Sequence, residues 1–295
     1  LVFPCREEES GVARKKKIGV GVIGCGGRIR GLLRSLPQRG ERIEVVALHD
    51  PDKRSIKAAR EAFNPEARIY ETYEDLVKDP GVDWVLIGSW NCFHKEHAVA
   101  AFRAGKHVFC EKPLATTLAD CVAMRKAHEQ AGTMFNIGFT LRYSPHYRKI
   151  RELIAKGAIG RLVSMEFNET LDFNHGGYIH GDWRRKTEWA GTHLLEKCCH
   201  DIDLTNWMVG SLARRVASFG ACDFFTPANR GARRRLGKDP RSGRPAYGTW
   251  LSPVGVDPFT ADKDIIDNQV AIIEYHNGVR ATFHTNCNAG IPSGG

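Results

Sequence analysis

The chain lacks the long apolar runs that membrane-spanning helices require. No stretch of its 295 residues approaches the roughly 20 consecutive apolar residues that cross a bilayer. The first residues, LVFPCREEE, do not have the basic-then-apolar order of a signal peptide, and the missing initial Met leaves open a segment upstream. We therefore expect no membrane partner.

Paired cysteines are also absent. The nine cysteines are scattered and odd in number, and none forms a CxxC pair, which is typical of reduced thiols in a cytoplasmic protein. Cys198 and Cys199 precede His200, but adjacent cysteines rarely direct both sulfurs to one metal, and no second Cys/His pair lies at zinc-finger spacing. We expect no metal site and no nucleophilic cysteine.

Excess positive charge is confined to one segment. The net charge is +9, and residues 230–244 alone contribute +6 from seven basic residues and one acidic residue. No basic stripe crosses the rest of the chain, so a nucleic-acid partner is not expected. Residues 223–264 are rich in Gly, Pro and Arg, which predicts a long excursion, and the basic segment within it is expected to be a solvated, mobile loop.

Strand and helix patterns alternate through the first half of the chain, after an arm expected over residues 1–16. This alternation predicts parallel βαβ units, and strands rich in Val and Ile indicate a sheet covered on both faces. Residues 17–138 are therefore expected to form a doubly wound parallel sheet of the α/β class. The expected strands are 18–23, 43–48, 83–87, 107–110 and 134–137, and the expected helices are 30–38, 53–63, 94–104 and 118–131.

The regular alternation of strands and helices ends after Gly138, and residues 139–295 are expected to form an α+β domain with a mostly antiparallel sheet. Asn277-Gly278 joins the last two expected strands, which is a strong hairpin signal. No internal repeat is present. The expected helices are 145–156 and 200–209, and the expected strands are 161–170, 214–220, 270–275 and 279–285.

A glycine-rich turn follows the first expected strand. Gly24, Gly26 and Gly27 are followed by Arg28 at the start of a helix, an arrangement that lets backbone N–H groups approach a pyrophosphate. Ile29 stands at the sixth position of the fingerprint, where Gly or Ala is usual, so we expect the helix to be displaced from the strand. A purely structural turn is the alternative.

Asp50 ends the second expected strand, 24 residues after Gly26. A carboxylate there accepts hydrogen bonds from the adenosine ribose and repels a 2′-phosphate, which favours NAD over NADP. Arg54 is near enough to weaken that exclusion. Capping of the next helix by Asp50 is the alternative.

Two further clusters carry acid–base chemistry. Lys112 follows an expected parallel strand, at the sheet edge where such folds bind ligands, and can transfer protons; a surface lysine is the alternative. Glu196 and His200 are four residues apart and share a face of a helix. His200 can transfer protons near neutral pH, with Glu196 or Asp203 orienting the ring.

Polar and aromatic groups in the second half suit a hydroxyl-rich or an anionic substrate. The candidate substrate residues are Arg142, Tyr143, Trp183, Arg184 and Asp203. Trp183 offers a face on which a sugar ring can stack, and a core position is the alternative.

Together these motifs resemble the glucose–fructose oxidoreductase and inositol dehydrogenase family (Gfo/Idh/MocA). The resemblance runs from Ile18 to about Gly210 and rests on the motifs VIGCGG at 22–27, LHDPD at 48–52, AGKHVFCEKP at 104–113 and HDID at 200–203. It implies a Rossmann domain followed by an open antiparallel sheet that often mediates oligomer contacts. Family members usually continue further, so we expect a C-terminal part to be absent.

The resemblance also implies roles for individual residues. Lys112 and His200 are expected to face the substrate alcohol and the nicotinamide, with Glu196 where many members have Asp. Besides the glycine turn and Asp50, the residues expected along the cofactor are Trp90, Asn91, His94, Glu111 and Lys112.

The sequence therefore predicts an NAD-dependent oxidoreductase that transfers hydride between the nicotinamide and a secondary alcohol of a sugar, inositol or related polyol. A homo-oligomer is expected. Two alternatives stay open: an NAD-dependent glycoside hydrolase of the same family, and a non-enzymatic cofactor-binding protein whose residues 230–244 contact an acidic partner.

Overall fold

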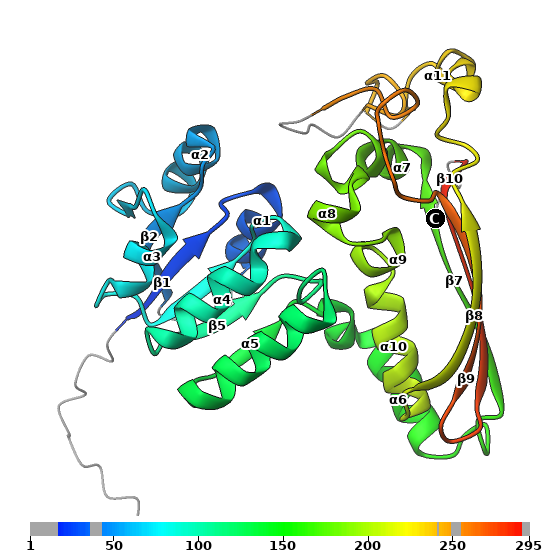
Figure 1. Cartoon of the computed structure of the whole chain (residues 1–295), viewed down its shortest axis with the longest axis horizontal. Coiled ribbons are helices and arrows are strands. Elements are labelled where there is room, and N and C mark those ends of the chain that lie inside the picture. Colours follow the sequence, from blue (N-terminus) through cyan, green and yellow to red (C-terminus); the bar gives the residue numbers. More distant parts are fainter. Residues whose placement is uncertain (1–16, 36–42, 241, 249–254, 291–295) are drawn as a thin grey trace, which may run out of the picture.

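The computed structural model describes residues 17–35, 43–240, 242–248 and 255–290. The predicted arm at residues 1–16 lies outside the described residues. Two sheets form the fold, and Figure 1 shows helices α8, α9 and α10 between them. No helix within the described residues is long and apolar enough to cross a membrane.

The first sheet has six strands in the order β3-β2-β1-β4-β5-β6, and every pair is parallel. This confirms the predicted doubly wound sheet and places the reversal of strand order between β1 and β4, where such folds bind dinucleotides. The two-residue strand β3 was not predicted. The strands are β1 Ile18–Ile23, β2 Ile43–His49, β3 Arg68–Ile69, β4 Trp84–Ile87, β5 His107–Cys110 and β6 Phe135–Ile137.

Helices cover both faces of this sheet (Figure 1). Two of them have the predicted bounds because local residues fix their starts: Asp52 caps α2 and Thr117 caps α5 through side-chain oxygens that accept backbone N–H groups. The short helix α3 was not predicted. The helices are α1 Gly27–Ser35, α2 Lys53–Phe63, α3 Tyr73–Lys78, α4 His94–Arg103 and α5 Leu118–Ala131.

Ile29 does not displace the first helix, contrary to the prediction from the motif. Helix α1 begins at Gly27, directly after the turn, and Ile29 is only 1% exposed. A Cβ atom at Gly88, just after β4, would lie 2.1 Å from Cγ1 of Ile29. The missing side chain at Gly88 therefore makes the room that Ile29 occupies.

The second sheet has the order β7-β10-β9-β8, with β7 and β10 parallel and the other pairs antiparallel. The predicted mostly antiparallel sheet is confirmed. The strand predicted at 161–170 begins and ends later than expected, and the last strand is longer. The strands are β7 Ser164–Asp172, β8 Ala213–Ala221, β9 Asn268–Tyr275 and β10 Arg280–Ala289; helices α6 Pro145–Ala155 and α10 Cys199–Val209 accompany them.

Four short elements between β7 and α10 were not predicted, because none is long enough to show a full helical period. Glu196 of the last one contacts Lys112 at the edge of the first sheet, and Ala190 contacts Asn91 after β4. They are α7 Phe173–His180, the 3₁₀ turn η4 Trp183–Arg185, α8 Thr187–Ala190 and α9 His193–Glu196.

The residues between β8 and β9 form the predicted long excursion, but the described part of the basic segment at 230–244 is not wholly a solvated loop. Residues Gly231–Leu236 form helix α11, and Phe225, Tyr247 and Phe259 are buried in one cluster with Ala232. A Cβ at Gly177 of α7 would lie 2.4 Å from the carbonyl oxygen of Tyr247. The glycine thus allows this segment to pack directly on α7, and apolar burial holds the segment in place.

Gly88→Ala is expected to lower the stability of the first domain, because its new Cβ would overlap Ile29. Overpacking of this kind costs roughly 1–3 kcal/mol. Thermal unfolding measures the change. The matched control is Gly31→Ala in α1, where a Cβ meets no atom within 4 Å and alanine favours the helix. Equal melting midpoints for wild type and Gly88→Ala would contradict the packing account.

Candidate active site

Lys112 joins the two domains at the carboxyl end of β5. Its ammonium donates to the carbonyl oxygen of Glu196 at 2.5 Å and lies 3.4 Å from Oε1 of the same residue. The two side chains are only 16% and 8% exposed. The peptide bond from Lys112 to Pro113 is cis. The Lys112 side chain is therefore mostly buried and faces α9. The alternative of a free surface lysine is wrong.

Glu196 is an ionised carboxylate between two cations. Arg184 donates to its Oε1 through Nε at 3.0 Å, and the same guanidinium donates to the Tyr178 hydroxyl at 2.7 Å and to Oδ1 of Asp182 at 3.1 Å. Burial opposes ionisation of Glu196, but the charges of Lys112 and Arg184 outweigh it and lower its pKa to about 2. Tyr178 was missed from the sequence because α7 was not predicted.

His200 lies at the start of α10 with a neutral ring. Burial and the positive charges of Lys112, Lys197 and Arg28 lower its pKa to about 4. Its Nδ1 atom is buried and has no hydrogen-bond partner among the described residues. Phe139 packs against the ring, with centroids 6.0 Å apart.

The carboxylate expected to orient His200 is engaged elsewhere. Glu196 binds Lys112 and Arg184, and Asp203 binds Arg142 through two bonds of 2.6 and 2.7 Å. A cation attracts a carboxylate more strongly than a neutral imidazole does. The expectation that Glu196 or Asp203 holds the ring is therefore corrected: each forms an ion pair instead.

The second-domain residues predicted for substrate differ in their availability. Arg142, in the 3₁₀ turn η3 Thr140–Tyr143, is paired with Asp203, while Tyr143 is exposed. Trp183 is only 6% exposed: Trp90 stacks on it with centroids 5.1 Å apart, and the guanidinium of Arg184 lies 4.2 Å from its ring centre. The indole of Trp183 is therefore a core group, and the expected stacking against a sugar ring is not available to it.

The glycine turn fits a dinucleotide. A Cβ at Gly26 or Gly27 would meet no atom within 4 Å, so the turn is open on that side for a pyrophosphate at the start of α1. Arg28 donates to the buried carboxylate of Glu111 at 2.8 Å. This bond ties the turn to the residue that precedes Lys112.

Asp50 is fixed at the end of β2 by backbone groups. Its Oδ2 accepts from the Cys25 N–H at 2.6 Å and its Oδ1 from the Asp52 N–H at 2.7 Å, while burial raises its pKa. Asp52, not Asp50, caps α2, so the capping alternative for Asp50 is wrong. Arg54 is paired with Asp52 at 3.0 Å and is therefore engaged away from Asp50.

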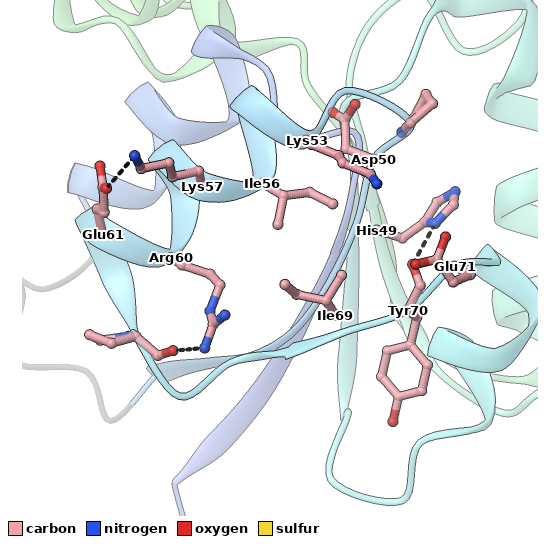
Figure 2. Close-up of a pocket in the computed structure, with 12 residues that line it drawn as sticks. His49, Asp50, Lys53, Ile56, Lys57, Arg60, Glu61, Ile69, Tyr70 and Glu71 are labelled. Atoms are coloured by element: carbon pink, nitrogen blue, oxygen red, sulfur yellow. Dashed lines mark hydrogen bonds and ion pairs between the residues drawn. The ribbon is translucent and has the colours of Figure 1, made fainter.

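A cavity of about 780 Å³ lies beside Asp50, between α2 and β3. Figure 2 shows Asp50 and Lys53 at one end and Arg60 and Glu61 toward the other. Only the end at Asp50 adjoins the glycine turn, and no residue that lines the cavity belongs to the group around Lys112. The cavity therefore suits the adenosine end of a dinucleotide and lies apart from the group around Lys112.

The residues predicted along the cofactor after β4 make other contacts. Trp90 stacks on Trp183, and the Asn91 side chain donates to the Ala190 carbonyl at 2.8 Å, so both contact the second domain. His94 is fully buried, and both of its ring nitrogens face backbone carbonyl oxygens.

Glu196→Gln is expected to destabilise the protein at neutral pH by a deficit that shrinks in acid. The folded-state pKa of about 2, against an ordinary 4.5, means that the ionised carboxylate contributes about 3 kcal/mol above pH 4.5. That contribution is lost as the pH falls from 4.5 toward about 2. Urea unfolding from neutral pH down to about pH 3 measures the deficit.

The control is Glu129→Gln, because the ion pair of Glu129 with Arg125 is exposed and contributes little. A deficit for Glu196→Gln that stays constant into acid would contradict the assignment of Glu196 as the shared anion.

Two family models match the chain. One, described as an oxidoreductase family with an NAD-binding Rossmann fold, matches residues 18–139. The other, described as the GFO/IDH/MocA C-terminal domain, matches residues 147–293.

Similar proteins carry dehydrogenase names. Inositol 2-dehydrogenase from Gluconacetobacter diazotrophicus is 33% identical over 196 residues, 65% of this chain and 54% of that protein. The chain spans about half the length of the curated relatives it matches.

Two solved structures show the same fold. Myo-inositol 2-dehydrogenase from Lactobacillus plantarum has a TM-score of 0.73 and 22% identity, covering 93% of this chain and 71% of that one. The WlbA dehydrogenase from Bordetella pertussis, in complex with NADH and UDP-GlcNAcA, has a TM-score of 0.73 and 23% identity, covering 93% and 73%. Since the family models together span both sheets and the motifs of Lys112 and His200, the chain belongs to the Gfo/Idh/MocA oxidoreductase family.

Proposed function

We propose that the protein is an NAD-dependent dehydrogenase that oxidises a secondary alcohol of a sugar, inositol or related polyol. One observation carries the proposal: the Lys112 ammonium lies at the carboxyl end of β5, held by Glu196, on the same sheet edge as the open turn at Gly26 and Gly27. Brought together in this way, a proton-transfer group and a dinucleotide turn suit hydride transfer.

The relatives support this proposal by their names. The family model for residues 18–139 is described as NAD-binding, and the 33%-identical relative is named inositol 2-dehydrogenase. The WlbA dehydrogenase structure contains NADH. Because the chain spans about half the length of its curated relatives, activity and substrate are proposed for this chain.

Two groups of the chain can hold the proton that leaves the alcohol. The nicotinamide, when bound, supplies the acceptor for the hydride from the carbinol carbon. His200 is neutral near pH 7, since its pKa is about 4, and therefore has a lone pair available. Lys112 must first release a proton to act as the base; as an ammonium it donates to the alcohol oxygen and stabilises negative charge there.

The charge balance of the site favours a hydroxyl-rich substrate over an anionic one. Lys112 and Arg184 share Glu196, and Arg142 is paired with Asp203. An anionic substrate would have to compete with these carboxylates, whereas hydroxyl groups can accept and donate hydrogen bonds without separating any ion pair.

The remaining parts of the proposal concern the assembly and its location. Phe219, Val270 and Ile272 are exposed together on the face of the second sheet, where Phe219 pairs with Val270, and this apolar face supports a homo-oligomer. The cytoplasmic location stays a prediction, supported by the eight described cysteines, which are all free.

Lys112→Met is expected to lower kcat for polyol oxidation by about 10²- to 10⁴-fold, the usual contribution of a positioned proton-transfer group. The assay follows NADH formation with myo-inositol and a panel of neutral polyols. Lys156→Met, an exposed substitution directly after α6, is the control and is expected to keep full activity. Full turnover by Lys112→Met would contradict a role of Lys112 in proton transfer. Release of sugar from an added glycoside, without net formation of NADH, would indicate the glycoside hydrolase instead.

Asp50→Asn is expected to reduce the preference for NAD over NADP by about tenfold, because it removes the charge that repels a 2′-phosphate. Calorimetric titration with both nucleotides measures the two dissociation constants. The exposed Asp75→Asn on α3 is the control and is expected to leave both constants unchanged. An unaltered preference in Asp50→Asn would show that another group discriminates between the cofactors.

A further inference from the structure

His94 lies between the loops that follow two neighbouring strands of the first sheet. It is the first residue of α4 and is 0% exposed. Its Nδ1 lies 2.8 Å from the carbonyl oxygen of Pro113, after β5, and its Nε2 lies 3.2 Å from the carbonyl oxygen of Ser89, after β4. A ring in this position can contact neither cofactor nor substrate.

The imidazole ring of His94 is neutral and donates a single hydrogen bond. Burial lowers the pKa of His94, against the raising effect of the two carbonyl contacts. A neutral imidazole has one N–H group, and the shorter contact assigns that group to Nδ1, which donates to Pro113. The unprotonated Nε2 is left at the longer distance from Ser89.

The hydrogen bond to Pro113 acts on the residue that follows Lys112. Pro113 has no N–H group, so its carbonyl is the one polar group through which its backbone can be held. Lys112 is thereby restrained on two sides: its ammonium by Glu196 of the second domain, and the main chain after it by His94 of the first. We propose that His94 is a positioning residue, which holds the Lys112 ammonium in its reactive place through the Pro113 carbonyl. The inference rests on the proposed function of Lys112.

His97 provides a matched control on the same helix. Its Nδ1 lies 2.9 Å from the Ser89 hydroxyl, and none of its hydrogen bonds among the described residues goes to Pro113. His97→Asn therefore disturbs the loop after β4 without releasing the backbone that carries Lys112.

The test exploits the different reach of two amide side chains. In His94→Asn the amide nitrogen can take the place of Nδ1 and donate to Pro113, whereas in His94→Gln it takes the place of Nε2 and reaches toward Ser89. We expect His94→Gln to lower kcat by roughly tenfold to a hundredfold, the effect of a misplaced reacting group. His94→Asn and His97→Asn are expected to stay within about threefold of wild type, and calorimetric NAD affinity is expected to be equal in all four proteins.

A second readout needs no turnover. The rate at which an amine-reactive acylating reagent modifies Lys112 is followed by peptide mass spectrometry, with exposed Lys156 as the internal reference. Release of the backbone after Lys112 is expected to raise the Lys112 rate severalfold in His94→Gln only. Thermal melting identifies variants that fail to fold, and if His94→Gln fails, His94→Asn against His94→Ala replaces the pair.

The outcomes separate the inference from the proposed function. Equal Lys112 labelling and equal kcat in all folded variants would overturn the positioning role of His94. Altered labelling in His94→Gln, together with full turnover by Lys112→Met, would uphold the positioning role and remove the catalytic role of Lys112.

Discussion

The ion pair between Lys112 and Glu196 is the contact on which the arrangement of the site depends. It joins the end of a strand in the first domain to a short helix of the second, and both side chains are mostly buried. Buried charges are costly unless further bonds satisfy them. Here Arg184 and the Glu196 carbonyl supply those bonds. Arg184 and Glu196 belong to the same domain, so only the contact of Lys112 with Glu196 crosses between the domains, and separation of the domains would remove it.

The sequence predicted most of the first domain because its signals are local. Parallel strands covered on both faces are uniformly apolar, and α2 and α5 begin at residues that cap them within the same segment. The second domain was harder, since α8 and α9 span only four residues each and show no periodicity. Strand β7 pairs in parallel with β10 from the far end of the chain, and no local pattern indicates such a pairing.

The candidate site was predictable in its composition but not in its pairing. Lys112 and Glu196 lie 3.4 Å apart, and the charges of both act on the buried ring of His200. The partner of Glu196, however, is decided by the short helices that carry Arg184 beside it, and these helices were not predicted. A carboxylate four residues before a histidine suggested a bond between them, yet two cations from other elements compete more effectively for it.

The segment from Gly88 to His94 contacts the glycine turn, the loop that carries Lys112 and the second domain. Its first residue also explains why Ile29 is tolerated where the motif usually has Gly or Ala. Gly88 has no side chain, and this leaves the space that the Ile29 side chain occupies next to the glycine turn. His94 donates to the Pro113 carbonyl in the loop that carries Lys112, and Asn91 binds the second domain. A larger residue in the turn is compensated by a smaller one in this segment, because interiors are close-packed and volume must balance locally. The fingerprint position and the segment after β4 therefore have to be judged together.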